Sequence, residues 1–335
     1  MKLSYSDEQN LLRDSVSKFC LSDYGFETRM KSVESEKGHN EEHWKLFAEL
    51  GWLAIPFAEE HGGLDGNDVD LSLMFEEFGK AIVVEPYLAN VVLGGGVLKR
   101  SDLEEKAKYI EGIITGESQV SLANYEPEKG FNLANVDCEI SSDGTVNGLK
   151  TTVLNAQNAD YFVVFGKHEK GHAFALVSKD TDGLKCTSYK TYDGFVSGDV
   201  KFENCKAEAV FSTDSALDIL EKTILDALIC VSSEAIGAME KCYQLTIEYT
   251  KQREQFGQPL SKFQALQHRM VDMFMETEFT KSFLLKVLAT HEEDEKRKLI
   301  YGLKNQVAIA GKSVAEEAVQ MHGGMGVTEE MSIGH

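Results

Sequence analysis

The sequence predicts an α+β multidomain protein: an N-terminal α-helical domain over residues 1–116, a middle antiparallel β-barrel domain over residues 117–213, and a C-terminal α-helical bundle over residues 214–335. Two observations carry this prediction. Apolar residues recur at spacings of three and four in the first and last thirds, as amphipathic helices require. Between them lie short runs of β-branched and aromatic residues, separated by turn residues, which favour strands.

The first predicted helix begins at a capping box. Ser6 and Gln9 stand three residues apart, so each side chain can accept the backbone N–H of the other residue. One apolar face follows at helical spacing. Its members are Leu12, Val16, Phe19 and Cys20.

A second helix is predicted from Asn40 to Gly51, because Asn is a favourable N-cap and Gly commonly ends a helix. It presents Trp44, Phe47 and Leu50 on one side. Helical spacing continues over residues 67–81 and 101–117, and Asp102 is the expected N-cap of the last segment.

The middle third contains a series of short runs that are typical of strands. They are QVSLANYE, CEISS, TVNGLKTTVLN, YFVVFG, HAFALVS, LKCTSY and GDVKFEN. Turn signals such as Asp143-Gly144 and Asp193-Gly194 separate them. Many short strands without intervening helices indicate an antiparallel barrel or sandwich.

The final third contains a single proline, Pro259, within the segment FGQPLS. Proline interrupts a helix, so this segment is the expected break between two long helices. The predicted helices cover residues 214–252, 260–290 and 292–321, and long antiparallel helices of this kind form a bundle.

The charge balance and the absence of certain segments limit the function classes. Lys and Arg total 34 against 55 Asp and Glu, a net charge of −21, so a nucleic-acid partner is not expected. No apolar run approaches the roughly 20 residues that span a bilayer, and no secretory signal is visible. The six cysteines show no Cys-x-x-Cys spacing, which favours buried free thiols and a cytoplasmic location.

Two short motifs are better explained by local structure than by chemistry. The segment from His39 to His43 matches the inverted zinc-protease pattern, but His39 precedes the predicted cap Asn40 and so lies outside the helix. We interpret the segment as a helix start, and no metal is expected. The glycine triplet at 94–96 does not fit a Rossmann fingerprint.

Two segments of the predicted bundle have features of a ligand site. Arg253 and Phe256 stand at the end of a long helix, where a guanidinium fork suits a diphosphate and a ring offers an aromatic face. After Gln320, the pair Gly323-Gly324 would let a flat ligand or a phosphate approach the backbone closely. A turn and a helix C-cap would explain each segment equally well.

Taken together, these stretches resemble the acyl-CoA dehydrogenase family over nearly the whole chain. The motifs that carry the resemblance, in their order, are ELGWLAIPFAEEHGGLDG, EEKAKYIEGIITGE, REQFGQPLSKFQALQHRMVDM and VQMHGGMG. The resemblance implies FAD-dependent α,β-dehydrogenation of an acyl-CoA to the trans-2-enoyl-CoA. In the family a glutamate removes the α-proton, a hydride passes to the flavin, and an electron-transfer flavoprotein then normally takes the electrons.

The resemblance also assigns residues to the cofactor. The residues that would contact the ADP half of FAD on a neighbouring subunit are Arg253, Phe256, Gln264, Gln320, Gly323 and Gly324. The family strand Trp-Ile-Thr, which packs on the flavin, is Thr152-Val153-Leu154 in this chain, so Val153 and Leu154 are expected at the flavin. The family's Thr-Glu-Pro and Gly-Ser-Asp stretch, which helps to hold acyl-CoA, is replaced by NYEPEKGFNLANV.

The catalytic base is not located by the resemblance. In one branch of the family its position aligns with Ala227, and the neighbouring Asp226 is the remaining candidate, although one residue along a helix turns a side chain by about 100 degrees. The other branch places its glutamate well after the Gly-Gly turn, past His335. The family's last helix also lies past that point, so we expect the chain to be truncated.

Three functions remain open at this stage. The chain is a catalytic dehydrogenase subunit, a non-catalytic partner subunit, or a flavin oxidase or oxygenase on the same fold. The partner role resembles the heteromeric acyl-CoA dehydrogenases of steroid side-chain and dicarboxylate degradation, in which two unlike subunits share each site. A dimer or tetramer, homomeric or mixed, is expected because donated residues act only across an interface.

Overall fold

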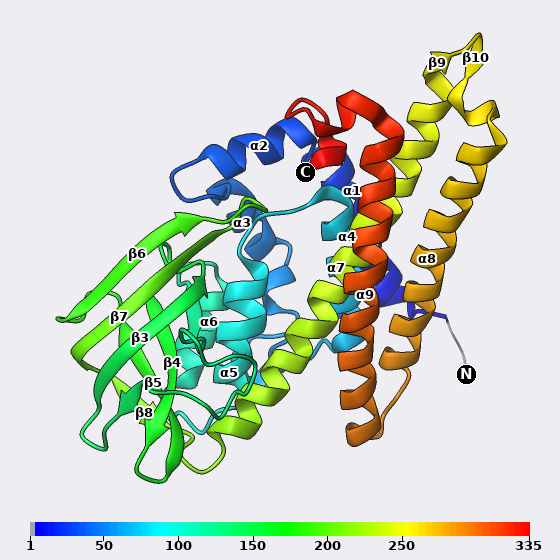
Figure 1. The fold of residues 1–335 in the computed structure, drawn as a ribbon. Helices are drawn as coiled ribbons and strands as arrows, with labels where there is room; N and C mark the ends of the chain where they lie inside the picture. The colour runs from blue at the N-terminus through cyan, green and yellow to red at the C-terminus, as the bar shows by residue number, and fades with distance from the viewer. Residues whose placement is uncertain (1–3) are drawn as a thin grey trace. The chain divides into compact units, whose positions relative to one another are not determined.

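The computed structural model describes residues 4–335, which fall into two compact units built from discontinuous segments. Unit 1 takes in the chain up to Arg29, then Asp68–Val83 and Leu228–His335. Unit 2 comprises Met30–Asn67 and Val84–Ala227. The domain limits at residues 116 and 213 stay predictions. The change from helices to strands and back to helices along the chain is present (Figure 1).

Unit 1 is helical. Its helices are α1 (Asp7–Ser22), α4 (Asp68–Ala81), α7 (Ala216–Gln252, in unit 1 from Leu228), α8 (Gln264–Leu288) and α9 (Glu293–His322). The predicted capping box is present at α1, where Gln9 N donates to Ser6 Oγ (3.2 Å) and Ser6 N donates to Gln9 Oε1 (3.1 Å). The three predicted bundle helices are confirmed to within about four residues at each end, the usual uncertainty of a boundary inferred from sequence.

Helices α4 and α7 cross with their backbones in contact. A Cβ on Gly79 would lie 1.8 Å from Glu234 O, and a Cβ on Gly237 would lie 1.9 Å from Glu76 O. No side chain fits at either position, so these two glycines set the distance between the helices.

The ends of α7, α8 and α9 enclose a shared core. Its buried members are Met239, Met270, Met273, Ala310, Val314, Ala318, Met321 and Ile333. The connection from α7 to α8 contains elements that the sequence did not indicate. They are the short strands β9 (Glu254–Gln255) and β10 (Gln258–Pro259), which form a hairpin, and the 3-10 turn η4 (Leu260–Lys262). After α9 follow the 3-10 turns η5 (Gly323–Val327) and η6 (Ser332–Gly334).

The helical part of unit 2 is made of short elements. They are α3 (Glu41–Glu49), η1 (Trp52–Ala54), η2 (Glu59–His61), the π-helical turn η3 (Leu88–Gly94), α5 (Gly95–Arg100) and α6 (Lys106–Ile114); α2 (Phe26–Glu34) runs from unit 1 into unit 2. Asn40 caps α3 as predicted, since its Oδ1 accepts Glu42 N–H (2.9 Å).

Asp102 is not the cap of α6, which begins only at Lys106. Its carboxylate instead accepts the backbone N–H (2.7 Å) and the hydroxyl (3.1 Å) of Ser212. The predicted cap was therefore wrong, because a partner 110 residues away along the chain holds the side chain.

The strands of unit 2 form one mixed sheet. They are β1 (Val120–Ala123), β2 (Glu139–Ile140), β3 (Thr145–Leu154), β4 (Tyr161–His168), β5 (Gly171–Ser178), β6 (Leu184–Lys190), β7 (Val196–Lys206) and β8 (Ala209–Phe211). The order is β6-β7-β3-β2-β4-β5-β8, with β1 also on β4. Strands β1 and β2 lie parallel to β4, and the others pair antiparallel.

The α+β class is confirmed, but the predicted antiparallel barrel needs correction in two respects. The sheet is not closed, and it is mixed. Strand β1 is separated from β4 by other strands of the chain, so no tight hairpin forces an antiparallel pairing there.

The glycine triplet at 94–96 is explained by packing within unit 2. A Cβ on Gly94, Gly95 or Gly96 would lie 2.2 Å from Val120 O, 2.6 Å from the Phe57 ring and 3.0 Å from Thr223 Cγ2, respectively. The triplet lets η3 and α5 pack closely against three different neighbours.

Candidate functional site

The loop between α7 and α8 carries three of the predicted FAD contacts. Arg253 follows α7 directly, Phe256 stands at the turn of the β9–β10 hairpin, and Gln264 is the first residue of α8. The turn residues Phe256 and Gly257 have φ angles of 57° and 81°. Two successive positive φ angles are typical of a type I′ hairpin turn, which explains the glycine.

The side chains at this loop are open to the surroundings. Within residues 4–335 the Arg253 guanidinium has no hydrogen-bond or ion-pair partner, and Phe256 is 90% exposed. The Phe263 ring lies edge-on to Phe256 with centroids 6.1 Å apart. A free guanidinium beside an exposed ring is a suitable surface for a diphosphate and an aromatic base.

The end of α9 carries the other three predicted contacts. Gln320 lies in its last turn, and Gly323 follows with φ 62° and ψ −143°, a conformation close to one that essentially only glycine adopts. An added Cβ would meet nothing within 4 Å at either glycine, but Gly324, unlike Gly323, does not have a positive φ. The packing of this chain does not require glycine at 324, whereas close approach of a ligand would.

Contacts between the helices bring these two segments to the same end of unit 1. The Tyr249 ring stacks on the His322 ring with centroids 4.2 Å apart, which joins α7 to α9. An ion pair between Arg269 and Glu317 joins α8 to α9. The six residues therefore line neighbouring helix ends, and they fit the ADP part of FAD in chemical character.

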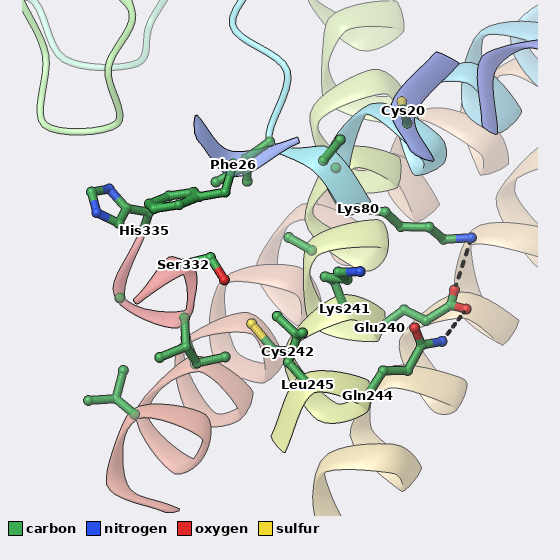
Figure 2. A pocket seen from close by; sticks show the side chains of 18 of the residues that line it. Cys20, Phe26, Lys80, Glu240, Lys241, Cys242, Gln244, Leu245, Ser332 and His335 are labelled. Atoms are coloured by element: carbon green, nitrogen blue, oxygen red, sulfur yellow. Dashed lines mark hydrogen bonds and ion pairs between the residues drawn. The ribbon is translucent and has the colours of Figure 1, made fainter. Parts of the chain in front are cut away.

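A cavity of about 1300 Å³ in unit 1 extends to this end of α9 (Figure 2). The ends of α1 and α4, the middle of α7 and the last residues of the chain line it, together with Gln320 and Gly323. Cys20, Cys242 and Leu245 give parts of the wall an apolar character, and Lys80 and Glu240 lie at one side.

That charged side of the cavity belongs to a network of ion pairs. Lys80 Nζ lies 2.8 Å from Glu77 Oε1 and 3.5 Å from Glu240 Oε2, and Lys281 contacts Glu76 and Glu240. Burial alone lowers the pKa of Lys80, but the carboxylates outweigh it and raise that pKa above its ordinary value. The network is internally satisfied, so it has a structural role.

The strand β3 carries Val153 and Leu154 in unit 2. A bulge interrupts its pairing with β7 between Lys150 and Val153, and Thr152 within it has φ 52°, which is unusual for a β-branched residue. Asp199 Oδ1 accepts Thr152 N–H (3.2 Å). The Val153 side chain lies in the core of the sheet, so only its backbone is available to a ligand, whereas Leu154 is half-buried.

Asp226, the candidate base, is engaged within unit 2. Its Oδ2 lies 2.6 Å from Arg100 Nη2 and 3.9 Å from Lys99 Nζ, and its side chain is 17% exposed. The carboxylate is thus held by two cations of α5. Sequence reasoning missed these partners because they lie more than 120 residues away.

The motif from His39 to His43 is a helix start, as predicted. Its two imidazoles face different groups: His43 Nδ1 lies 3.2 Å from Glu85 Oε1, and His39 packs edge-on to Trp44. Burial, the largest influence, lowers the pKa of His39. Within residues 4–335 no three His, Cys, Asp or Glu side chains gather closely enough to hold a metal ion.

All six cysteines are free. Four are buried as predicted, and Cys242 is half-buried. The prediction was wrong for Cys186, which is exposed because it lies on the edge strand β6, whose residues are exposed or half-buried. None of the helices formed by residues 4–335 is long and apolar enough to cross a membrane.

Comparison with known proteins identifies the family. Residues 6–117 match the model "Acyl-CoA dehydrogenase, N-terminal domain", and residues 217–335 match "Acyl-CoA dehydrogenase, C-terminal domain". The probable acyl-CoA dehydrogenase YngJ of Bacillus subtilis is 27% identical over 99% of this chain and 92% of its own length.

Two solved structures illustrate the shared fold. The acyl-CoA dehydrogenase of Geobacillus kaustophilus superimposes with a TM-score of 0.89 at 25% identity, covering 100% of this chain and 92% of that one. A chain of the ChsE4-ChsE5 complex from Mycobacterium tuberculosis gives a TM-score of 0.89 at 22% identity, covering 100% of this chain and 91% of that one. This chain belongs to the acyl-CoA dehydrogenase family, FAD-dependent oxidoreductases that act on CH–CH groups.

Proposed function

We propose that this chain is a subunit of an FAD-dependent enzyme that dehydrogenates an acyl-CoA to the trans-2-enoyl-CoA, and that it lends the ADP-binding half of the FAD site to a neighbouring subunit. One observation carries the proposal. At one end of unit 1, an arginine with no partner in the described part of the chain lies on neighbouring helix ends with an exposed aromatic ring and a glycine that packing does not require. No contact among residues 4–335 accounts for this combination.

Each group has a distinct role in the proposal. Arg253 would hold the diphosphate through two parallel charge-assisted hydrogen bonds, and the backbone at Gly323 and Gly324 would admit the cofactor closely. Gln264 and Gln320 would supply amide donors and acceptors. Bound FAD supplies the hydride acceptor, and an electron-transfer flavoprotein would then receive the electrons.

A second candidate role is a non-catalytic partner subunit that supplies only this donated half. Two observations favour it: the Val153 side chain is buried away from any ligand, and Asp226 is committed to Arg100. A flavin spectrum from the chain expressed alone supports the catalytic role. Colour that develops only when an unlike family member is co-expressed supports the partner role, and rapid reoxidation of the reduced flavin by oxygen identifies an oxidase.

The proposal is tested at Arg253. Arg253→Ala should weaken FAD retention in the purified oligomer roughly 10- to 100-fold, because a charge-assisted pair contributes about 1.5–3 kcal/mol. The measurement is the ratio of flavin absorbance to protein, followed by FAD titration of the apoprotein.

The matched control is Arg297→Ala, which removes a partly exposed arginine of α9 that pairs with Asp294 (2.6 Å). It should leave FAD retention unchanged. Equal FAD affinity in the Arg253→Ala and Arg297→Ala proteins would refute the assignment of Arg253.

A further inference from the structure

The two segments proposed to contact FAD belong to helices that are distant in the chain, so something must fix their relative position. One contact lies directly between them. Tyr249 is one turn before Arg253, whose N–H donates to Tyr249 O (2.8 Å), and His322 immediately precedes Gly323. The two rings stack with a centroid distance of 4.2 Å and an interplanar angle of 27°.

This contact is built from both side chains and backbone. The Tyr249 hydroxyl donates to His322 O (3.2 Å), one of the carbonyls that a helix leaves without a partner at its C-terminus. The His322 ring is itself fixed, since Nδ1 lies 2.8 Å from Ala318 O and the residue is 3% exposed. A carbonyl only accepts, so Nδ1 carries the hydrogen.

The position of His322 affects the backbone that follows it. Gly323 leaves the helix in a conformation that almost only glycine adopts, and Gly324 then lies in open space. The direction in which these two glycines present their backbone follows from the orientation of the last residue of α9. That residue is His322, and Tyr249 holds it.

We propose that Tyr249 and His322 form a clasp that positions the Arg253 segment and the Gly323-Gly324 segment relative to each other for FAD binding. They are positioning residues and do not contact the cofactor. This inference rests on the proposed function, because it concerns how the donated half of the FAD site is held.

The test compares variants of the clasp in the purified holo-oligomer. Tyr249→Leu removes the ring stack and the hydroxyl, and FAD affinity should fall about 10-fold or more. Tyr249→Phe keeps the stack and loses only the hydrogen bond to His322 O, so its FAD affinity should lie between that of Tyr249→Leu and the parent. If Tyr249→Leu does not fold, the FAD affinities of Tyr249→Phe and His322→Phe test the clasp instead.

A control separates positioning from general stability. Leu284→Ala truncates a buried side chain near the end of α8, far from Gln264 at the start of that helix. It should lower the melting temperature without changing FAD affinity. The clasp is refuted if the Tyr249 variants have a lower melting temperature than the parent protein but bind FAD as tightly as the Leu284→Ala variant does. If Arg253→Ala also leaves FAD affinity unchanged, the proposed function fails; if only Arg253→Ala weakens FAD, the clasp alone fails.

Discussion

The contacts of Asp226 with two cations indicate an ion-pair partner rather than a catalytic base. By position it is the carboxylate next to the residue aligned with a family base, but the structure gives it two cationic neighbours on α5. A general base must reach the proton that it removes. A carboxylate held 2.6 Å from a guanidinium is arranged for an ion pair.

We therefore expect Asp226→Asn to change the rate of flavin reduction by an acyl-CoA less than about 10-fold, whereas loss of a general base typically lowers a rate roughly 100- to 10,000-fold. The variant should instead be less stable by about 1 kcal/mol, because a partly buried ion pair is broken. Stopped-flow flavin bleaching and urea unfolding measure the two effects. A rate loss of 100-fold or more at unchanged stability would identify Asp226 as the base.

Lys150 and Glu126 form the most deeply buried ion pair among those described here. Lys150 Nζ lies 2.6 Å from Glu126 Oε1, and the two side chains are 0% and 4% exposed. Glu126 also accepts the backbone N–H groups of Asp137 (2.5 Å) and Cys138 (3.0 Å). The pair thus fastens the loop before β2 to strand β3, three residues before Val153.

Lys150→Met should destabilise the protein by about 3–5 kcal/mol, because it leaves a buried carboxylate without its cation. The control is Lys201→Met, which breaks an exposed pair with Glu203 (2.7 Å) and should cost less than about 1 kcal/mol. Chemical denaturation of both variants gives the comparison. Similar losses of unfolding free energy in the two variants would show that the buried ion pair stabilises the protein no more than the exposed one.

The same pair predicts a dependence on pH. Burial, the largest influence, raises the pKa of Glu126, but the hydrogen bonds from Lys150 and the two backbone N–H groups outweigh it, and the pKa lies below its ordinary value. A carboxyl with a lowered folded-state pKa stabilises the fold fully above its ordinary pKa. That contribution is lost as the pH falls through the lowered pKa.

Among the elements, the crossing of α4 and α7 has the tightest geometry. Gly79 and Gly237 face backbone carbonyls at distances that no Cβ tolerates. Separating α4 from α7 would also break the ion pair between Lys80 of α4 and Glu240 of α7, which Lys281 of α8 contacts as well.

Gly237→Ala should therefore destabilise unit 1 by at least about 1–3 kcal/mol, the usual range for overpacking. Gly311→Ala is the matched control, since Gly311 also lies in a long helix but its Cβ would be 3.9 Å from the nearest atom, Met239 Sδ. It should be neutral or stabilising by up to about 1 kcal/mol, because Ala favours a helix over Gly. Equal melting temperatures for the two variants would contradict the view that the close contact at the crossing requires glycine.

At the scale of the molecule, the outer face of α8 carries a stripe of exposed apolar side chains. They are Val271, Phe274, Met275 and Phe279, each between 47% and 62% exposed. Their spacing of three and four places them on one side of the helix. Such a stripe is typical of a protein interface, and the donated half-site that we propose requires one.

We expect the double variant Met275→Glu/Phe279→Glu to shift the oligomer toward smaller species, because two charges would be buried in an apolar contact. FAD retention should fall with it if the same assembly brings donor and recipient subunits together. Light scattering measures the mass, with Glu316→Gln on α9 as a control that should leave it unchanged. An unaltered mass in the double variant would place the subunit interface elsewhere.

The sequence by itself determined the parts of this protein that depend on local rules. The capping box at Ser6, the cap at Asn40 and the long helices of the bundle follow from side chains within a few residues of one another, and all are present. The family motifs likewise identified the family, since their order along the chain is a property of the sequence alone.

The tertiary structure decided whatever depends on partners far apart in the chain. It replaced the predicted antiparallel barrel by an open mixed sheet, committed Asp102 to Ser212 and Asp226 to Arg100, and exposed Cys186 on an edge strand. Tyr249 and His322 carry no local signal, yet they meet at the end of the bundle. The physical reason is that local patterns fix backbone conformation, whereas pairing, burial and charge depend on which distant groups folding brings together.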